Sequence, residues 1–118
     1  CQSAGMSEAF KNAEYYMGVN VGGKGYGDWI YPFAYYFLEY MLYGPLEKPA
    51  DVHTANTSLD FPSDVVLGEP VHAKKAYDIL KHFGATKNKG STIEIYHPTP
   101  LNEVYFPAPA TIELEKRL

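Results

Sequence analysis

The chain has 118 residues, 46% of them hydrophobic and 20% charged, a composition that excludes a disordered segment and suits one globular domain with a buried core. Its formal net charge is −4, and its basic residues occur in short, scattered groups, which argues against nucleic-acid binding. The longest apolar stretch, residues 29–43, is interrupted by Glu39 and is too short to span a membrane.

The first part of the chain predicts a flexible tether followed by a short helix and a strand. Residues 1–7 are mostly small and polar, as in a tether, and we assign residues 8–118 to a single globular domain. Ser7 can cap a short helix that follows it. Side chains alternate over residues 14–21, which predicts a strand, and the glycine-rich residues 22–27 predict a turn.

An aromatic helix is predicted next. It would begin after Asp28, a helix-capping residue, and end near Tyr43, before Gly44 and Pro45. Pro32 would lie in its first turn, where proline is tolerated. Large aromatic side chains occupy nearly every face of this helix. Such a helix is either buried in the core or partly exposed for a partner, and the pattern leaves both readings open.

A long polar loop and a second helix follow. Residues 44–70 are rich in proline, aspartate, asparagine, serine and threonine and have little periodicity. Loops of this length are uncommon in compact domains and are often functional. Residues 71–83 carry apolar side chains at helical spacing and lysines on the opposite face, and Gly84 is placed to end this helix.

Short strands are predicted in the last part of the chain. Two-residue alternation appears at residues 92–96, 104–106 and 111–114, and the prolines between these segments keep them short. Together the predicted elements indicate an α+β fold, in which two principal helices pack on a small, mostly antiparallel sheet.

The single cysteine, Cys1, has no second thiol with which to form an intrachain disulfide or a thiolate zinc site. The segment Cys1-Gln2-Ser3-Ala4-Gly5 resembles the start of a mature bacterial lipoprotein. That resemblance implies a lipid on Cys1, and Gln2 in place of aspartate implies an outer-membrane anchor. Two alternatives stay open: Cys1 as an N-terminal nucleophile with its own amine as base, or an accidental chain boundary.

Tyrosine is the second unusual feature, with 11 residues in the chain. Tyrosine combines a large apolar body with a polar tip and is therefore enriched at protein interfaces. The alternative is that most of these rings form the core. The residues predicted to bind a partner are Trp29, Tyr31, Tyr35, Tyr36, Tyr40 and Tyr43.

No catalytic or metal-binding motif is complete. Residues 18–25 approach a phosphate-binding loop, but the position of its Ser or Thr is glycine and no helix is predicted to start there. No two histidines stand four residues apart, so a helical zinc site is not predicted, although His53 with Asp51 or Asp60 stays open. Glu39 lies among aromatic residues, and burial would raise its pKa. We therefore predict no catalytic residue, metal or cofactor.

These features predict a small, non-enzymatic protein-binding module of the bacterial cell envelope. The lipoprotein resemblance implies that it faces the periplasm, where its partner would be a toxin that it neutralises as an immunity protein, or an envelope component. The alternative is a small-ligand-binding protein or hydrolase, whose pocket would lie between the aromatic helix and the 44–70 loop. That alternative predicts a concave site where Glu39 or a histidine meets tyrosine hydroxyls.

Overall fold

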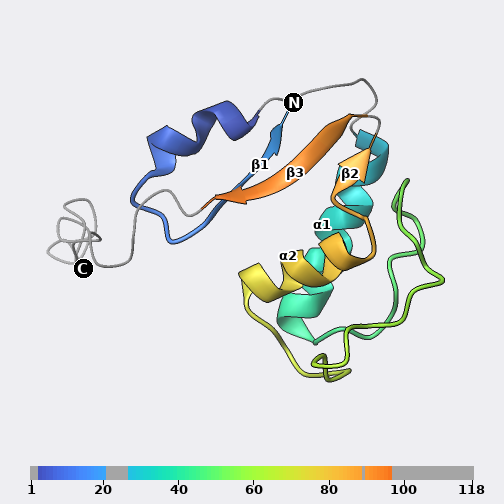
Figure 1. Cartoon of the computed structure of the whole chain (residues 1–118). Coiled ribbons are helices and arrows are strands. Elements are labelled where there is room, and N and C mark those ends of the chain that lie inside the picture. Colours follow the sequence, from blue (N-terminus) through green and yellow to red (C-terminus); the bar gives the residue numbers. More distant parts are fainter. Residues whose placement is uncertain (1–2, 21–26, 89, 97–118) are drawn as a thin grey trace, which may run out of the picture.

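The computed structural model describes residues 3–20, 27–88 and 90–96 (Figure 1). Helices combine with a three-stranded antiparallel sheet, which confirms the α+β class predicted from the sequence. The elements in chain order are η1 (Ser3–Phe10), β1 (Tyr16–Asn20), α1 (Gly27–Leu42), α2 (Ala73–His82), β2 (Lys87–Asn88) and β3 (Ser91–Tyr96). The strands predicted at 104–106 and 111–114 lie outside the described residues.

The sheet has the strand order β1–β3–β2. β1 pairs with β3 along its whole length, from Tyr16 opposite Tyr96 to Asn20 opposite Thr92. β2 was not predicted, because two polar residues carry no alternation. It forms through its pairing with β3, which follows a turn containing Gly90 at φ +85°.

The amino-terminal segment, whose flexibility as a tether stays a prediction, is described from Ser3 onward. Its described part belongs to η1, a 3-10 helix that starts at Ser3. The Ser3 hydroxyl accepts a hydrogen bond from the Val19 amide at 2.8 Å, and the Tyr16 hydroxyl donates to the Ser3 carbonyl at 2.6 Å. Both contacts join residues distant in the sequence, so local composition could not reveal them.

Helix α1 buries one stripe of large side chains against the rest of the molecule. Trp29, Phe33, Tyr36 and Tyr40 are each at most 4% exposed, and their spacing places them on one helix face. The helix ends where it was predicted to end, since Gly44 follows Leu42 and Tyr43 with φ +84°. Pro32 lies inside the helix, one turn further in than predicted.

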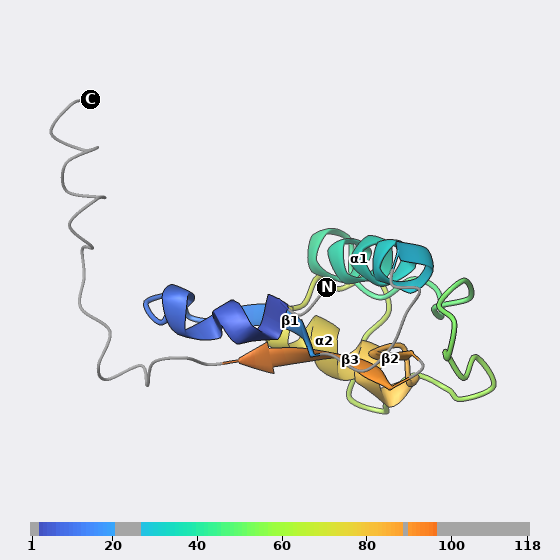
Figure 2. The ribbon, with the colours of Figure 1, turned by 90° about the horizontal axis from the view of Figure 1, so that it is seen from above.

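Helix α2 supplies the other half of the core. It buries Ala76, Ile79 and Leu80, and Phe83 follows its last turn with no exposed surface. The Tyr77 hydroxyl donates a hydrogen bond to the Ile93 carbonyl at 2.9 Å and so joins α2 to β3. In Figure 2, α1 lies along one side of the described part, with α2 and β3 on the other.

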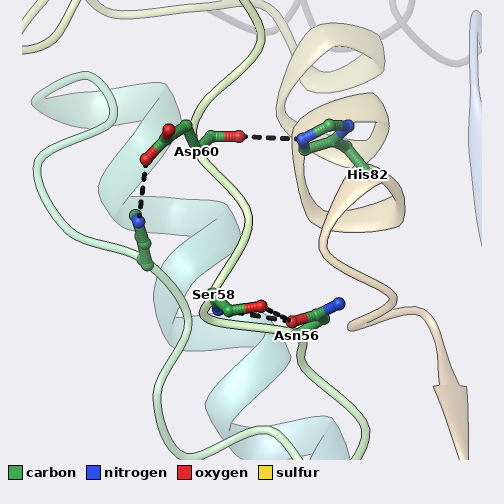
Figure 3. A network of polar contacts seen from close by, with 5 residues as sticks. Asn56, Ser58, Asp60 and His82 are labelled. Carbon is green, nitrogen blue, oxygen red and sulfur yellow. Dashed lines mark hydrogen bonds and ion pairs between the residues drawn. The ribbon is translucent and has the colours of Figure 1, made fainter.

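The 44–70 loop closes on itself and packs against both helices. At its base the Gly68 amide donates a hydrogen bond to the Pro45 carbonyl at 3.0 Å. Further along, His82 of α2 donates to the Asp60 carbonyl at 2.9 Å (Figure 3). The ring of Phe61 meets that of Phe83 edge to face at 5.2 Å. The loop is therefore an ordered part of the domain, on the side of the helices away from η1 (Figures 1 and 2).

Candidate functional site

An apolar stripe faces outward along α1. Tyr31 is 77% exposed, Tyr35 58%, Leu38 54% and Leu42 64%. Positions 31, 35, 38 and 42 follow the helical repeat, so these four side chains line one face. We call these four residues the outward stripe. They lie on the opposite side of α1 from the buried stripe that begins at Trp29.

The exposed apolar surface continues past the end of the helix. Tyr43 is 66% exposed and Leu46 is 55% exposed. Single exposed apolar residues are normal on protein surfaces, but a series along one element indicates a site of interaction. The outward stripe and its continuation are therefore the first candidate functional surface.

The six residues predicted to bind a partner divide into two groups. Tyr31, Tyr35 and Tyr43 are exposed, as a binding surface requires. The other three are in the core, which corrects their assignment to a surface: Trp29, Tyr36 and Tyr40. The two buried tyrosines satisfy their hydroxyls by hydrogen bonds to the loop backbone, and this arrangement allows complete burial of their rings.

A pocket lies between α1 and the start of the 44–70 loop. Its cavity volume is about 470 Å³. Helix α1 supplies an aromatic wall, and the loop supplies a wall with two carboxylates. We call this cavity the tyrosine pocket; its lining residues are Tyr31, Pro32, Tyr35, Tyr36, Glu47, Ala50 and Asp51. Because Tyr31 and Tyr35 also belong to the outward stripe, the pocket and the stripe form one continuous surface.

Buried tyrosines of α1 hold the loop wall in place. The Tyr40 hydroxyl donates to the Glu47 carbonyl at 2.8 Å, and the Tyr36 hydroxyl accepts from the Ala50 amide at 3.1 Å. Both tyrosine rings are at most 4% exposed. The backbone on either side of Lys48 is therefore fixed to the core, and the pocket is preformed.

Negative charge gathers beside the pocket. Burial, followed by repulsion from the Glu47 carboxylate, raises the pKa of Glu39 above its ordinary value. One carboxylate oxygen of Glu39, Oε2, is buried and accepts no hydrogen bond from the described residues. Glu39 and Glu47 also raise the pKa of the Tyr35 hydroxyl, which, like an ordinary tyrosine, is protonated at neutral pH. Tyr35 is thus a hydrogen-bond donor at this surface.

The histidines and metal-ligand candidates lie apart. His53 is 3.6 Å from the Asp28 carboxylate, and no ion pair among the described residues joins it to Asp51 or Asp60, the partners that the sequence left open. His82 contacts the Asp60 carbonyl and, edge to face, the ring of Phe83, and His97 lies outside the described residues. Within residues 3–20, 27–88 and 90–96, no group of three or more His, Cys, Asp or Glu side chains is arranged to hold a metal ion.

Sequence reasoning did not place Glu47 or Asp51 in a pocket, and it considered Asp51 only as a metal ligand with His53. Both lie in a segment without periodicity, and their place beside Tyr35 depends on the two buried tyrosine hydroxyls. One signal was available: a loop that leaves a helix through Gly44 and Pro45 reverses direction, so its first residues run back along that helix. Applied to residues 46–51, that rule would have placed Glu47 near the aromatic side chains.

Cys1, the predicted lipid-attachment site, lies outside the described residues, and its acylation stays a prediction. Among the helices that the structure describes, none has the length and apolar character needed to cross a membrane. Comparison of the chain with known proteins gave no match to a family model, to a curated protein or to a solved structure.

Proposed function

We propose that this chain is a protein-binding module that engages its partner through the outward stripe of α1. The observation that carries the proposal is the division of one aromatic helix into a buried stripe and an exposed stripe of tyrosine and leucine. Tyrosine and leucine bury a large area when such a surface meets a partner, and tyrosine is prominent among the residues that dominate binding energy.

Charge favours a protein over a membrane surface as the partner of this face. Glu39, Glu47 and Asp51 stand on α1 and the adjoining loop, and the helix has no basic residue in its last turn. Helices that lie on anionic membranes carry lysine and arginine on their polar side. An acidic flank would instead be repelled by anionic lipid headgroups.

The setting of this interaction is proposed from the sequence. The resemblance of residues 1–5 to a mature lipoprotein implies an envelope location facing the periplasm, with a lipid on Cys1. In that setting the partner would be a toxin neutralised by this chain, or a component of an envelope complex. Either partner would bind the same surface. The first experiment therefore tests the surface, and not the cellular location or the class of the partner.

Site-specific photocrosslinking tests the proposed surface directly. We expect p-benzoylphenylalanine placed at Tyr35 to crosslink to one discrete protein in the native host. The same group at Met6, which is 54% exposed on η1, is the matched control and should yield no such product. Identical products from both positions would contradict the proposal. Crosslinks only to a second copy of this chain would replace a foreign partner with self-association.

The affinity for the crosslinked protein then measures the importance of the stripe. Leu38→Asp should weaken binding at least tenfold by calorimetry, because it places a charge in the buried centre of the interface. Met6→Asp, at a side chain that is 54% exposed on η1, should leave the dissociation constant unchanged. Equal affinities for the two variants would rule out the stripe as the binding surface.

A further inference from the structure

We infer that the tyrosine pocket receives an arginine side chain of the bound protein. This inference rests on the proposed function, because the arginine belongs to the partner that covers the outward stripe. It adds a specific chemical requirement to that partner: a guanidinium group must reach the cavity between α1 and the start of the 44–70 loop.

One wall of the pocket suits the flat face of a guanidinium group, and the other wall suits its edge. Tyr31 and Tyr35 are exposed and aromatic, and a planar cation stacks favourably on such rings. Glu47 and Asp51 lie on the opposite wall, where the edge of the guanidinium would donate hydrogen bonds to their carboxylates. Lysine would supply the charge but not the flat stacking surface or the paired donors.

The carboxylates of the pocket have no counter-ion within the described residues. Lys48 lies between them in sequence, but its ammonium is 3.3 Å from the Asp60 carboxylate, away from the pocket. His53 is paired with Asp28 at 3.6 Å. No described ion pair includes Glu47 or Asp51. The basic side chains next to the pocket in sequence are therefore engaged elsewhere.

The nearby Glu39 adds to the negative charge beside the pocket and so favours a cationic ligand. Its carboxylate repels that of Glu47, and its buried oxygen lacks a hydrogen-bond donor among the described residues. A cation in the pocket would reduce the repulsion between these acids. The charge pattern is thus complementary to an arginine.

The pocket also needs little rearrangement to bind. Tyr36 and Tyr40 already fix the backbone of Ala50 and Glu47, and a cavity of about 470 Å³ is open between the walls. A preformed site avoids the entropy loss of ordering a loop when the ligand enters. The affinity of the guanidinium group itself is then measurable with a small probe.

The test uses the full chain and Nα-acetyl-L-arginine N-methylamide as the probe, followed by amide NMR shifts. We expect saturable shifts for the backbone of residues 47–51 and for Tyr35. The citrulline analogue has nearly the same shape without the charge, and it should bind at least fivefold more weakly. The lysine analogue should fall between them. Equal affinity for the arginine and citrulline probes would overturn the inference.

Variants of the loop wall give the second readout. Glu47→Gln and Asp51→Asn keep the shape of each side chain, and each should weaken binding of the arginine probe at least threefold. Glu69→Gln, at an exposed acid outside the pocket, is the matched control and should leave it unchanged. Unchanged binding in the double variant would also overturn the inference. If the arginine probe does not bind but photocrosslinking through Tyr35 succeeds, the inference of a bound arginine is wrong, and the proposal of a protein-binding surface is still supported.

Discussion

Glu39 is the residue whose surroundings differ most from those of an ordinary surface acid. It is partly buried on α1, between the outward stripe and the core, and it faces a second acid, Glu47. Desolvation and like charge both oppose ionisation, so the folded state holds a proton on Glu39 more tightly than the unfolded chain does. The carboxylate therefore destabilises the fold whenever it is charged.

Replacement of Glu39 should reveal this penalty as a pH dependence. Because its folded-state pKa is raised, the free energy of unfolding falls as pH rises from the ordinary glutamate range, near pH 4, through the raised value. Glu39→Gln should therefore stabilise the protein by about 0.5 kcal/mol at pH 7, the scale of one partly exposed charge interaction. Below the ordinary range the gain should vanish. Urea unfolding at several pH values measures it.

Glu69 is the control for this experiment, since its side chain is exposed and belongs to no ion pair among the described residues. Glu69→Gln should change the unfolding free energy by less at pH 7. A Glu39→Gln variant with no gain at neutral pH, or with a gain that persists at pH 3, would show that the carboxylate is not strained in the folded state.

At the scale of elements, the base of the 44–70 loop is a tightly constrained turn. Gly44 has φ +84°, and a Cβ atom added there would clash with the Glu69 amide nitrogen. Backbone from the two ends of the loop thus meets at a position where only glycine fits. This contact sets the direction in which residues 45–51 return along α1, and so it positions the loop wall of the pocket.

Gly44→Ala should therefore be severely destabilising. The left-handed backbone conformation disfavours alanine by about 1–2 kcal/mol, and the clash with Glu69 adds to it, so we expect a total loss above about 2 kcal/mol. Gly5→Ala is the matched control, because nothing lies within 4 Å of the added Cβ. Urea unfolding compares the two variants, and similar midpoints would contradict the proposed constraint.

Sequence patterns predicted an element well where its polar and apolar side chains lay on different faces. Residues 71–83 have a polar and an apolar face, and α2 lies within those bounds at Ala73–His82. For α1, the pattern was apolar on every side and could not identify the buried stripe. That choice is made by α2 and by Val19 and Ile93 of the sheet, which pack against the Trp29 side.

The site was less predictable than the fold, because its parts come together through tertiary contacts. Tyr31 and Tyr35 were among the predicted partner residues. Tyr36 and Tyr40 were assigned to the same surface, but their rings are buried and their hydroxyls form hydrogen bonds with the loop backbone. A hydroxyl that binds a loop carbonyl leaves no local pattern in the sequence. Glu47 and Asp51 depend on those bonds for their position, and for that reason sequence reasoning did not place them in a pocket.

At the scale of the whole molecule, the core is unevenly distributed. The side chains of α1 and α2 are buried around Tyr40, Leu80 and Phe83, each with no exposed surface. The far end of the sheet, where Tyr16 pairs with Tyr96, is only half-buried and packs beside η1 (Figure 1). The stability of the chain should decrease from the helix pair toward that end.

Native-state hydrogen exchange tests this gradient. We expect the amides of Ile79 and Leu80 to exchange only through global unfolding. Amides near the pair of Tyr16 and Tyr96 should exchange through local opening of lower free energy, since few buried contacts hold that end. Measurements at two pH values establish that opening is at equilibrium. Equal protection throughout the sheet and helices would contradict an uneven core.

The loop wall of the tyrosine pocket is held by its main chain. Tyr36 and Tyr40 contact the Ala50 amide and the Glu47 carbonyl, and neither contact involves a loop side chain. Positions 47 and 51 can therefore change identity while the wall keeps its shape. Single substitutions at these positions could change the ligand preference of the pocket without changing the backbone of its wall. A library that varies only these two positions would yield folded proteins with different ligand preferences.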